Sequence, residues 1–156
     1  MSFQVRVATL NEVGLVYQVT QAAFSEYRGV LPSLPGALQE TLADVEQSMR
    51  EGGAVLALEE GAYLAGAARY KLLEDALYIG RVAVLPTYRR RGVGGLLLSH
   101  LEDLGRSLGK SEVHLSTRQS LPGNVAFYES LGYTVIGSEA YPAPIADYSL
   151  ALSKPL

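Results

Sequence analysis

Short apolar runs, separated by glycine, proline or acidic pairs, recur along most of the chain and predict β-strands. The first run, FQVRVA, alternates apolar and polar positions, as a half-buried strand does. A later run, ALYIGRVAVL, follows an acidic turn at Glu74-Asp75 and ends at a Leu-Pro pair. We predict strands over residues 3–8, 54–60, 62–73, 76–85, 112–117, 133–141 and 147–153.

Helical spacing separates these strands. After Gly92, apolar residues recur at 93, 97, 101, 104 and 108, which predicts a helix that ends at Gly109. Asn11 is placed to cap a first helix, and Gly132 to close a short one. Helices are predicted over residues 12–27, 37–53, 93–108 and 124–131.

The predicted order is β-α-α-β-β-β-α-β-α-β-β, which indicates an α/β (α+β) protein with a mixed sheet flanked by helices. The chain has 156 residues, without repeats or a linker, so we expect a single domain over residues 1–156.

Composition narrows the class of protein. Apolar residues make up 48% of the chain and charged residues 19%, as in globular proteins. The sequence has no apolar run of about 18 residues and no signal-peptide pattern, so we expect a cytoplasmic protein that does not enter a membrane. The absence of cysteine excludes disulfides, thiolate metal sites and a cysteine nucleophile, and no metal is expected.

Charge is unevenly distributed along the chain. The formal net charge is −3, which argues against nucleic acid as a partner. Residues 1–60 carry three cations and eight acids, a net of −5, whereas residues 61–156 carry ten cations and eight acids, a net of +2. The first interpretation of this distribution is ordinary scatter of charges over the surface. The alternative is an acidic end that receives a cation and a basic end that receives an anion.

The basic end centres on PTYRRRGVGGLLL, residues 86–98. Three arginines and three glycines lie there between a predicted strand and a predicted helix. The first N–H groups of a helix have no internal acceptor, and they carry the positive end of its dipole. Glycines allow an anion to approach these groups, and arginines add forked donors. The segment therefore predicts a phosphate site.

Two nucleotide motifs do not fit this segment. In a dinucleotide G-x-G-x-x-G fingerprint, Gly92 and Gly94 match, but the last position is Leu97. GRSLGKS, residues 105–111, is one residue short of a phosphate-binding loop and precedes a strand instead of following one.

A third pattern fits better. Arg89-x-x-Gly92-x-Gly94 resembles the acetyl-CoA motif of the GCN5-related N-acetyltransferase (GNAT) family. NVAFYESLGY, which begins at Asn124, resembles the second hallmark of that family. The resemblance implies the GNAT fold, in which about six to seven strands and about four helices surround a sheet that splays between the fourth and fifth strands.

The resemblance also implies where coenzyme A binds. The pyrophosphate would lie on the backbone amides of residues 90–95, flanked by the arginines. The fourth strand would bulge near Arg81-Val82, and its exposed edge would pair with pantetheine. The implied coenzyme A residues are Val82, Ala83, Val84, Arg89, Arg90, Arg91, Gly92, Val93, Gly94, Gly95, Asn124 and Tyr128.

The chemistry implied is direct attack of a primary amine on the thioester of acetyl-CoA. Tyr128, which shares a helix face with Asn124, would donate a proton to the leaving sulfur, and the Val82–Val84 backbone would stabilise the oxyanion. In some relatives the fourth strand supplies a glutamate as base, but residues 78–84 hold no carboxylate here. Candidates for the base are His114, Glu26, Glu74, a water chain and an amine that arrives neutral.

The acceptor is not defined by the sequence beyond a small-molecule or peptide amine, and the length of the acyl chain also stays open. Four aromatic residues are candidates for its pocket: Tyr17, Phe24, Tyr27 and Tyr141. A non-catalytic, coenzyme A-binding regulatory module is the alternative function. A basic-loop nucleic-acid binder is disfavoured, because few aromatics accompany the arginines. A homodimer is compatible with the sequence.

Overall fold

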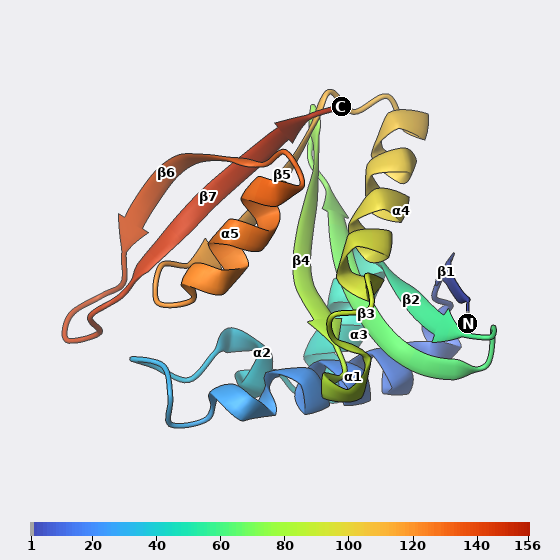
Figure 1. Ribbon diagram of the computed structural model, residues 1–156, viewed down its shortest axis with the longest axis horizontal. Coiled ribbons are helices and arrows are strands. Elements are labelled where there is room, and N and C mark those ends of the chain that lie inside the picture. Colours follow the sequence, from blue (N-terminus) through green and yellow to red (C-terminus); the bar gives the residue numbers. More distant parts are fainter. Residues whose placement is uncertain (1) are drawn as a thin grey trace.

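The computed structural model describes residues 2–156 and contains one seven-stranded sheet with the order β1-β2-β3-β4-β5-β7-β6 (Figure 1). Every neighbouring pair is antiparallel except β4 and β5, which are parallel. The strands are β1 (Phe3–Val7), β2 (Gly53–Glu59), β3 (Tyr63–Leu72), β4 (Ala76–Val84), β5 (Glu112–Arg118), β6 (Thr134–Ala140) and β7 (Tyr148–Pro155).

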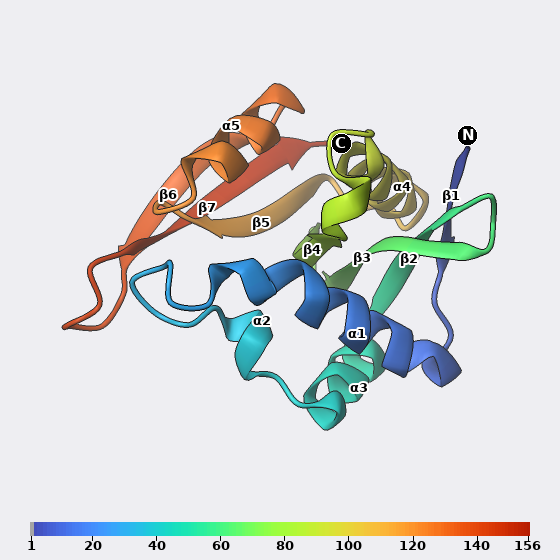
Figure 2. The same cartoon turned by 60° about the horizontal axis from the view of Figure 1, so that its bottom comes forward.

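Helices cover both faces of the sheet. Helices α1, α2 and α3 lie on one face, and α4 and α5 lie on the other (Figure 2). The helices are α1 (Val13–Phe24), α2 (Gly36–Gln39), α3 (Leu42–Glu51), α4 (Val93–Ser107) and α5 (Pro122–Ser130). Short 3₁₀ segments cover Leu10–Glu12, Ser25–Tyr27 and Pro86–Tyr88. In the described part of the chain, no helix combines the length and apolarity that crossing a bilayer needs.

The sheet opens between its two parallel strands. β4 and β5 pair only from Ala76 with Glu112 to Ile79 with Leu115. Beyond these four pairs the strands diverge, and Figure 1 shows β5 leaving β4 toward α5. The splay expected between the fourth and fifth strands is therefore confirmed.

A β-bulge in β4 lies where the opening begins. Ala67 of β3 pairs with Ala83, but Arg69 pairs with Gly80, so Ala68 alone lies opposite Arg81 and Val82. Arg81 has φ +51°, an unusual conformation for a residue with a side chain. The bulge expected near Arg81-Val82 is confirmed, and its local kink turns the end of β4 away from β5.

The core follows the alternation of side chains along the central strands. Val55 and Ala57 of β2 pack toward α4, whereas Ala54 and Leu56 pack toward α1 and α3. Because helices cover both faces, β2 is buried on both sides and has the nearly continuous apolar sequence GAVLALE.

Two helix predictions were wrong in detail. The helix expected over residues 37–53 is broken into α2 and α3, because Thr41 and Asp44 form a capping box that starts a new helix. Asn11 does not cap the first helix, since it lies inside a 3₁₀ turn that Thr9 and Glu12 cap instead. The fifth helix of the fold results from the first of these differences.

Candidate active site

The loop that joins β4 to α4 leaves helix amide groups without acceptors. Gly92 adopts φ +81° and ψ 7° at the N-terminus of α4, in the left-handed region that favours glycine. The first hydrogen bond of the helix joins Leu96 N–H to Gly92 O at 3.1 Å. The N–H groups of Val93, Gly94 and Gly95 precede it, so they have no acceptor within the helix. The first turn contains no acidic side chain that could occupy them.

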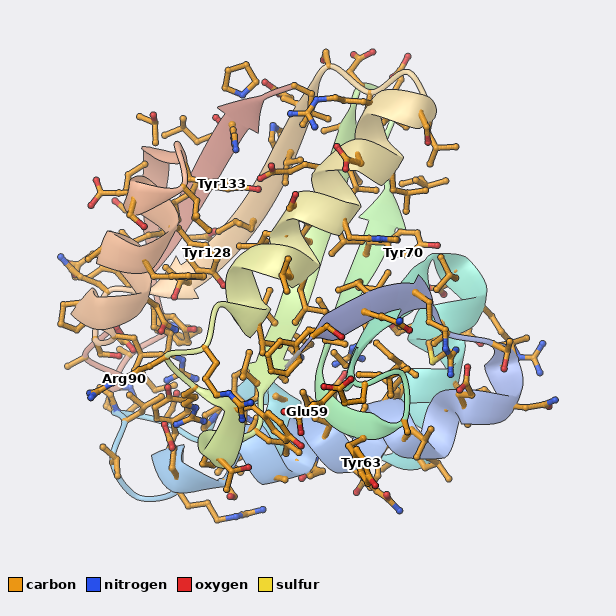
Figure 3. The ribbon with its side chains drawn as sticks, turned by 45° about the vertical axis from the view of Figure 1, so that its right-hand side comes forward. Glu59, Tyr63, Tyr70, Arg90, Tyr128 and Tyr133 are labelled. Atoms are coloured by element: carbon orange, nitrogen blue, oxygen red, sulfur yellow. The ribbon has the colours of Figure 1, made fainter. Side chains whose placement is uncertain are left out.

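The three arginines of this loop have different surroundings. Arg89 donates from Nη2 to Ala23 O at 3.0 Å and from Nη1 to the Glu26 carboxylate, which ties the loop to the end of α1. Arg91 donates to Glu59 at 2.7 Å on the opposite side of the loop. Arg90 is exposed, with φ +62°, and forms no ion pair with another described residue. In Figure 3, Arg90 lies on the α5 side of the loop and Glu59 on the β2 side.

A cavity of about 630 Å³, here called the loop cavity, lies between this loop, α5 and the end of β4. Eleven of the twelve residues expected to bind coenzyme A line this cavity, and the exception is Arg91. Its walls are Ala23, Phe24, Tyr27, Val82, Ala83, Val84, Tyr88, Arg89, Arg90, Gly92, Val93, Gly94, Gly95, Gly123, Asn124, Phe127 and Tyr128.

The edge of β4 that faces β5 borders this cavity. Leu85 N–H donates to Ala65 O on β3 at 2.9 Å. Because successive peptide groups of a strand point to opposite edges, those of Val82 and Val84 face the opening. Arg89 Nε donates to Val84 O at 3.3 Å, so one carbonyl on this edge is already in use. No described strand pairs with this edge beyond Ile79.

A second cavity of about 320 Å³, here called the sheet cavity, fills the space between the splayed strands. It is lined by Phe24, Tyr27, Leu31, Pro35, Gly36, Ala37, Tyr78, Ile79, Gly80, Arg81, Val82, Ser116, Thr117, Arg118, Leu121, Asn124, Tyr128, Tyr141 and Ser149. Three of the four aromatic candidates for an acceptor pocket are among them, while Tyr17 packs against the apolar core near α1 and α3.

Tyr128 belongs to the walls of both cavities. It is the buried residue of α5, only 8% exposed, and its ring packs against Phe127 and Tyr133 at centroid distances of 5.3 and 6.0 Å. Its hydroxyl donates no hydrogen bond to another described residue. Burial, with smaller contributions from Tyr27 and Tyr78, raises the pKa of Tyr128 to about 12. The hydroxyl therefore stays protonated throughout the neutral range.

The spacing of Phe127 and Leu131 along the short helix predicts that both face the core; Leu131 packs against it, but Phe127 does not. Its side chain is 37% exposed and lines the loop cavity, where its Cζ lies 3.1 Å from the position that a Cβ on Gly94 would take. The apolar core contact of α5 is made by Tyr128 instead.

Neither cavity has a carboxylate or an imidazole among the residues that line it. Of the three side chains considered as a base, His114 interacts with Glu112 on β5 at 2.5 Å, and Glu26 pairs with Arg89. Glu74 lies in the exposed turn between β3 and β4, at the closed end of the opening. The structure brings none of them into the cavities.

Several lining residues had no sequence signal as part of a site. Tyr78 lies near the start of β4 and Arg118 at the end of β5, and both line the sheet cavity. Arg118 holds the segment before α2 against the opening through Ser33 O at 3.0 Å and Leu34 O at 3.2 Å. Its side chain also lies 3.5 Å from the buried carboxylate of Asp147.

A split mixed sheet, with a glycine-rich helix N-terminus at the split, defines the class of this fold, an α/β protein whose free helix amides face the opening. The model of the acetyltransferase (GNAT) family matches residues 16–133, and the chain belongs to this family. The resemblance inferred from the two motifs is thereby confirmed.

Relatives of known activity match part of the chain. The ribosomal protein bS18-alanine N-acetyltransferase of Escherichia coli K12 is 34% identical over 76 residues, 49% of this chain and 51% of the relative. Its counterpart in Salmonella typhimurium LT2 is 39% identical over 59 residues, 38% of this chain and 40% of the relative. The chain thus spans about half the length, or less, of these relatives.

Solved structures match the whole fold. The Escherichia coli ribosomal-protein-S18-alanine N-acetyltransferase superposes with a TM-score of 0.81 at 21% identity, covering 99% of this chain and 94% of that one. The PaiA N-acetyltransferase of Thermoplasma acidophilum, solved with coenzyme A, gives 0.80 at 16% identity and covers both chains completely. These matches confirm the GNAT fold.

Proposed function

We propose that this protein is an acetyl-CoA-dependent N-acetyltransferase that acts on a primary amine. The observation that carries the proposal is the position of Tyr128, which lines both the loop cavity and the sheet cavity. A proton donor at this junction can serve a reaction between a ligand in one cavity and a ligand in the other. Membership of the GNAT family supports the same reaction.

The loop cavity fits coenzyme A in its donors and its space. The free amides of Val93, Gly94 and Gly95, together with Arg90, suit a pyrophosphate. A Cβ at Gly95 would meet no atom within 4 Å, so the backbone is open to a ligand there. The peptide groups of Val82 and the N–H of Val84 suit the amides of pantetheine. Because Arg91 lies outside the cavity and Arg89 holds α1, Arg90 carries most of the side-chain charge in this proposal.

The residues at the junction supply what the transfer needs. Acetyl-CoA provides the acetyl group as a thioester, whose carbonyl carbon a neutral amine attacks directly. The N–H groups of Val82 and Val84 on the open edge of β4 are the donors for the oxygen that becomes negative. Tyr128 donates its proton to the sulfur as the carbon–sulfur bond breaks. With no carboxylate or imidazole lining either cavity, the amine reacts in its neutral form and releases its proton to water.

The acceptor class contains small-molecule amines and the N-terminal amines of peptides. The partial match to the bS18-alanine N-acetyltransferases supports testing a peptide with an N-terminal alanine. A regulatory module that binds coenzyme A without turnover uses the same loop cavity but makes no use of the Tyr128 proton.

The decisive experiment measures release of free thiol from acetyl-CoA across a panel of amines that includes such a peptide. Binding of coenzyme A is measured in parallel by calorimetry. Amine-dependent thiol release supports the enzyme. Tight binding of coenzyme A without acetylation of any amine supports the module, and absence of binding removes both functions.

A further inference from the structure

The side chains that line the sheet cavity are positively charged, which does not match the alternative in which an acidic first third of the chain receives a cation. Two arginines, Arg81 and Arg118, line the cavity, and no carboxylate does. The acids of the first third are engaged elsewhere: Glu12 pairs with Arg6, Glu26 with Arg89 and Glu59 with Arg91.

A further cavity of about 300 Å³, here called the Glu40 cavity, shares the wall Tyr78, Gly80 and Arg81 with the sheet cavity. Its other walls are Glu40, Ser48, Arg69, Tyr70 and Lys71. The two cavities together have four cations in their walls and one carboxylate. Counting Asp147, which lies beside Arg118, still leaves two positive charges in excess.

The carboxylate of Glu40 forms an ion pair with a buried arginine, Arg69. Arg69 is 4% exposed and donates both terminal nitrogens to Glu40, at 2.8 and 2.5 Å. The Arg69 pair thus uses both oxygens of Glu40. Arg81 adds only a single bond, from Nε to Glu40 Oε1 at 3.2 Å.

The forked end of Arg81 is left for another acceptor. Neither terminal nitrogen of Arg81 donates to a described residue, and its side chain is 39% exposed. One of these nitrogens lies 2.9 Å from the position of a Cβ on Gly36, so the guanidinium lies close against the backbone of the segment that starts α2. Two parallel N–H groups of this kind match the oxygens of a carboxylate or phosphate.

The backbone conformation of Arg81 adds a second, independent observation. Its φ of +51° at the bulge lies in the left-handed region that residues with a side chain rarely adopt, and such strain concentrates at functional sites. The bulge also places Arg81 at the mouth of the opening, next to Val82, whose peptide group faces the loop cavity.

We propose that the acceptor of this enzyme carries an oxyanion, a carboxylate or a phosphate, in addition to its amine, and that Arg81 binds this oxyanion. The inference rests on the proposed function and specifies its substrate class. The amine lies at the Tyr128 end of the sheet cavity, and the oxyanion lies at the Arg81 end, beside the excess charge of the Glu40 cavity.

The test uses matched acceptors that differ only in the anion. Amino acids are compared with their amides, and phosphoethanolamine with ethanolamine, at saturating acetyl-CoA. An amide has the less basic amine and so a larger neutral fraction, which makes it the faster acceptor if no oxyanion site exists. We expect the anionic member of at least one pair to have the higher kcat/KM, by about tenfold or more. The favoured pair distinguishes a carboxylate from a phosphate.

Variants assign the preference to Arg81. Arg81→Gln should raise the KM for the favoured anionic acceptor about tenfold and leave the KM for acetyl-CoA unchanged. Arg81→Lys should keep part of the preference, because it keeps the charge but loses the fork. Arg50→Gln, which removes a cation paired with Glu46 on the far surface of α3, is the matched control and should keep the full preference.

The outcomes separate this inference from the proposed function. Equal or better use of the neutral acceptors, or an equal effect of Arg81→Gln on both members of a pair, overturns the oxyanion site alone. Binding of N-acetylglycine and N-acetylglycinamide, followed by NMR, does not require turnover. If the parent protein acetylates no amine but binds N-acetylglycine better than N-acetylglycinamide, and Arg81→Gln removes this difference, the oxyanion site is supported and the enzymatic function is overturned. Absence of both effects overturns both.

Discussion

The Arg91 guanidinium donates to the Glu59 carboxylate across 2.7 Å and lies over the rings of Phe3 and Tyr88. Tyr88 donates its hydroxyl to the same carboxylate at 3.1 Å. Three adjacent arginines therefore do not form one basic patch. Arg91 fixes the loop to the β1–β2 edge, and Arg90 alone is both exposed and part of the loop cavity without an ion-pair partner among the described residues.

Replacing these two arginines should thus have different consequences. Arg90→Gln should weaken coenzyme A binding about threefold to tenfold and leave pantetheine binding unchanged, with a difference that shrinks as salt screens the charge. Arg91→Gln should lower the free energy of unfolding by about 1–2 kcal/mol and affect the two ligands equally. Calorimetry with both ligands, together with urea denaturation, measures these effects. If Arg91→Gln discriminates between the ligands and Arg90→Gln does not, the assignment is reversed.

A side chain at Gly94 should interfere with the pyrophosphate. Gly94→Val should reduce coenzyme A affinity at least tenfold, about 1.4 kcal/mol, because its branched side chain enters the loop cavity beside Phe127. The matched control is Gly14→Val, at the same second position of α1, where a Cβ meets nothing within 4 Å. Both variants are checked for folding by thermal denaturation. Unchanged affinity in a folded Gly94→Val protein excludes the phosphate site.

Loss of the Tyr128 hydroxyl should slow turnover without loss of ligand. Tyr128→Phe keeps the packed ring, so acetyl-CoA binding should be nearly normal, whereas kcat should fall by about 10²- to 10⁴-fold. The lower end is expected, because a thiolate leaves fairly well unaided, and the deficit should decrease as pH rises. Steady-state kinetics from pH 6 to 9 measures this.

Tyr133→Phe provides the comparison. The Tyr133 hydroxyl donates to the buried carboxylate of Glu102 at 2.8 Å, away from both cavities. Its removal should cost stability, about 1–3 kcal/mol, and leave kcat nearly unchanged. If Tyr128→Phe behaves in the same way, the Tyr128 hydroxyl is structural.

The pH dependence should report the acceptor and not a basic side chain of the enzyme. Burial keeps the pKa of Tyr128 near 12, so the acid stays protonated from pH 6 to 9 and does not limit the rate there. The rate should then rise with pH as the acceptor amine loses its proton. The profile of kcat/KM is measured with two acceptors of different amine pKa, and its midpoint should move with the acceptor. A midpoint that stays fixed near pH 6–7 would reveal an enzymatic base.

Local chemistry explains which parts of the site could be predicted. Gly92, Gly94 and the preceding strand determine a helix N-terminus within about ten residues of chain, and the loop was found from them. The break between α2 and α3 also has a local signal in the sequence, because Thr41-x-x-Asp44 is a capping-box pattern.

Long-range pairing explains the rest. The sequence does not indicate that Arg89 pairs with Glu26, 63 residues earlier, or that Arg69 donates to both carboxylate oxygens of Glu40. The net charge of −5 over residues 1–60 therefore does not determine the charge of the sheet cavity. The charge of a cavity depends on which acids are already paired, and this depends on the tertiary fold.

The loop cavity and the sheet cavity are lined by different stretches of the chain, so one can change in sequence without the other. Most of the loop cavity comes from one continuous region, residues 82–128, whereas the sheet cavity adds the segment around Leu31–Ala37 and the C-terminal residues Tyr141 and Ser149. Substitutions or length changes in those outer segments change the wall of the sheet cavity, the proposed acceptor site, and leave the loop between β4 and α4 intact. If the proposed function holds, new acceptors can be acquired by variation or by engineering at a few surface segments, while the site for coenzyme A stays the same.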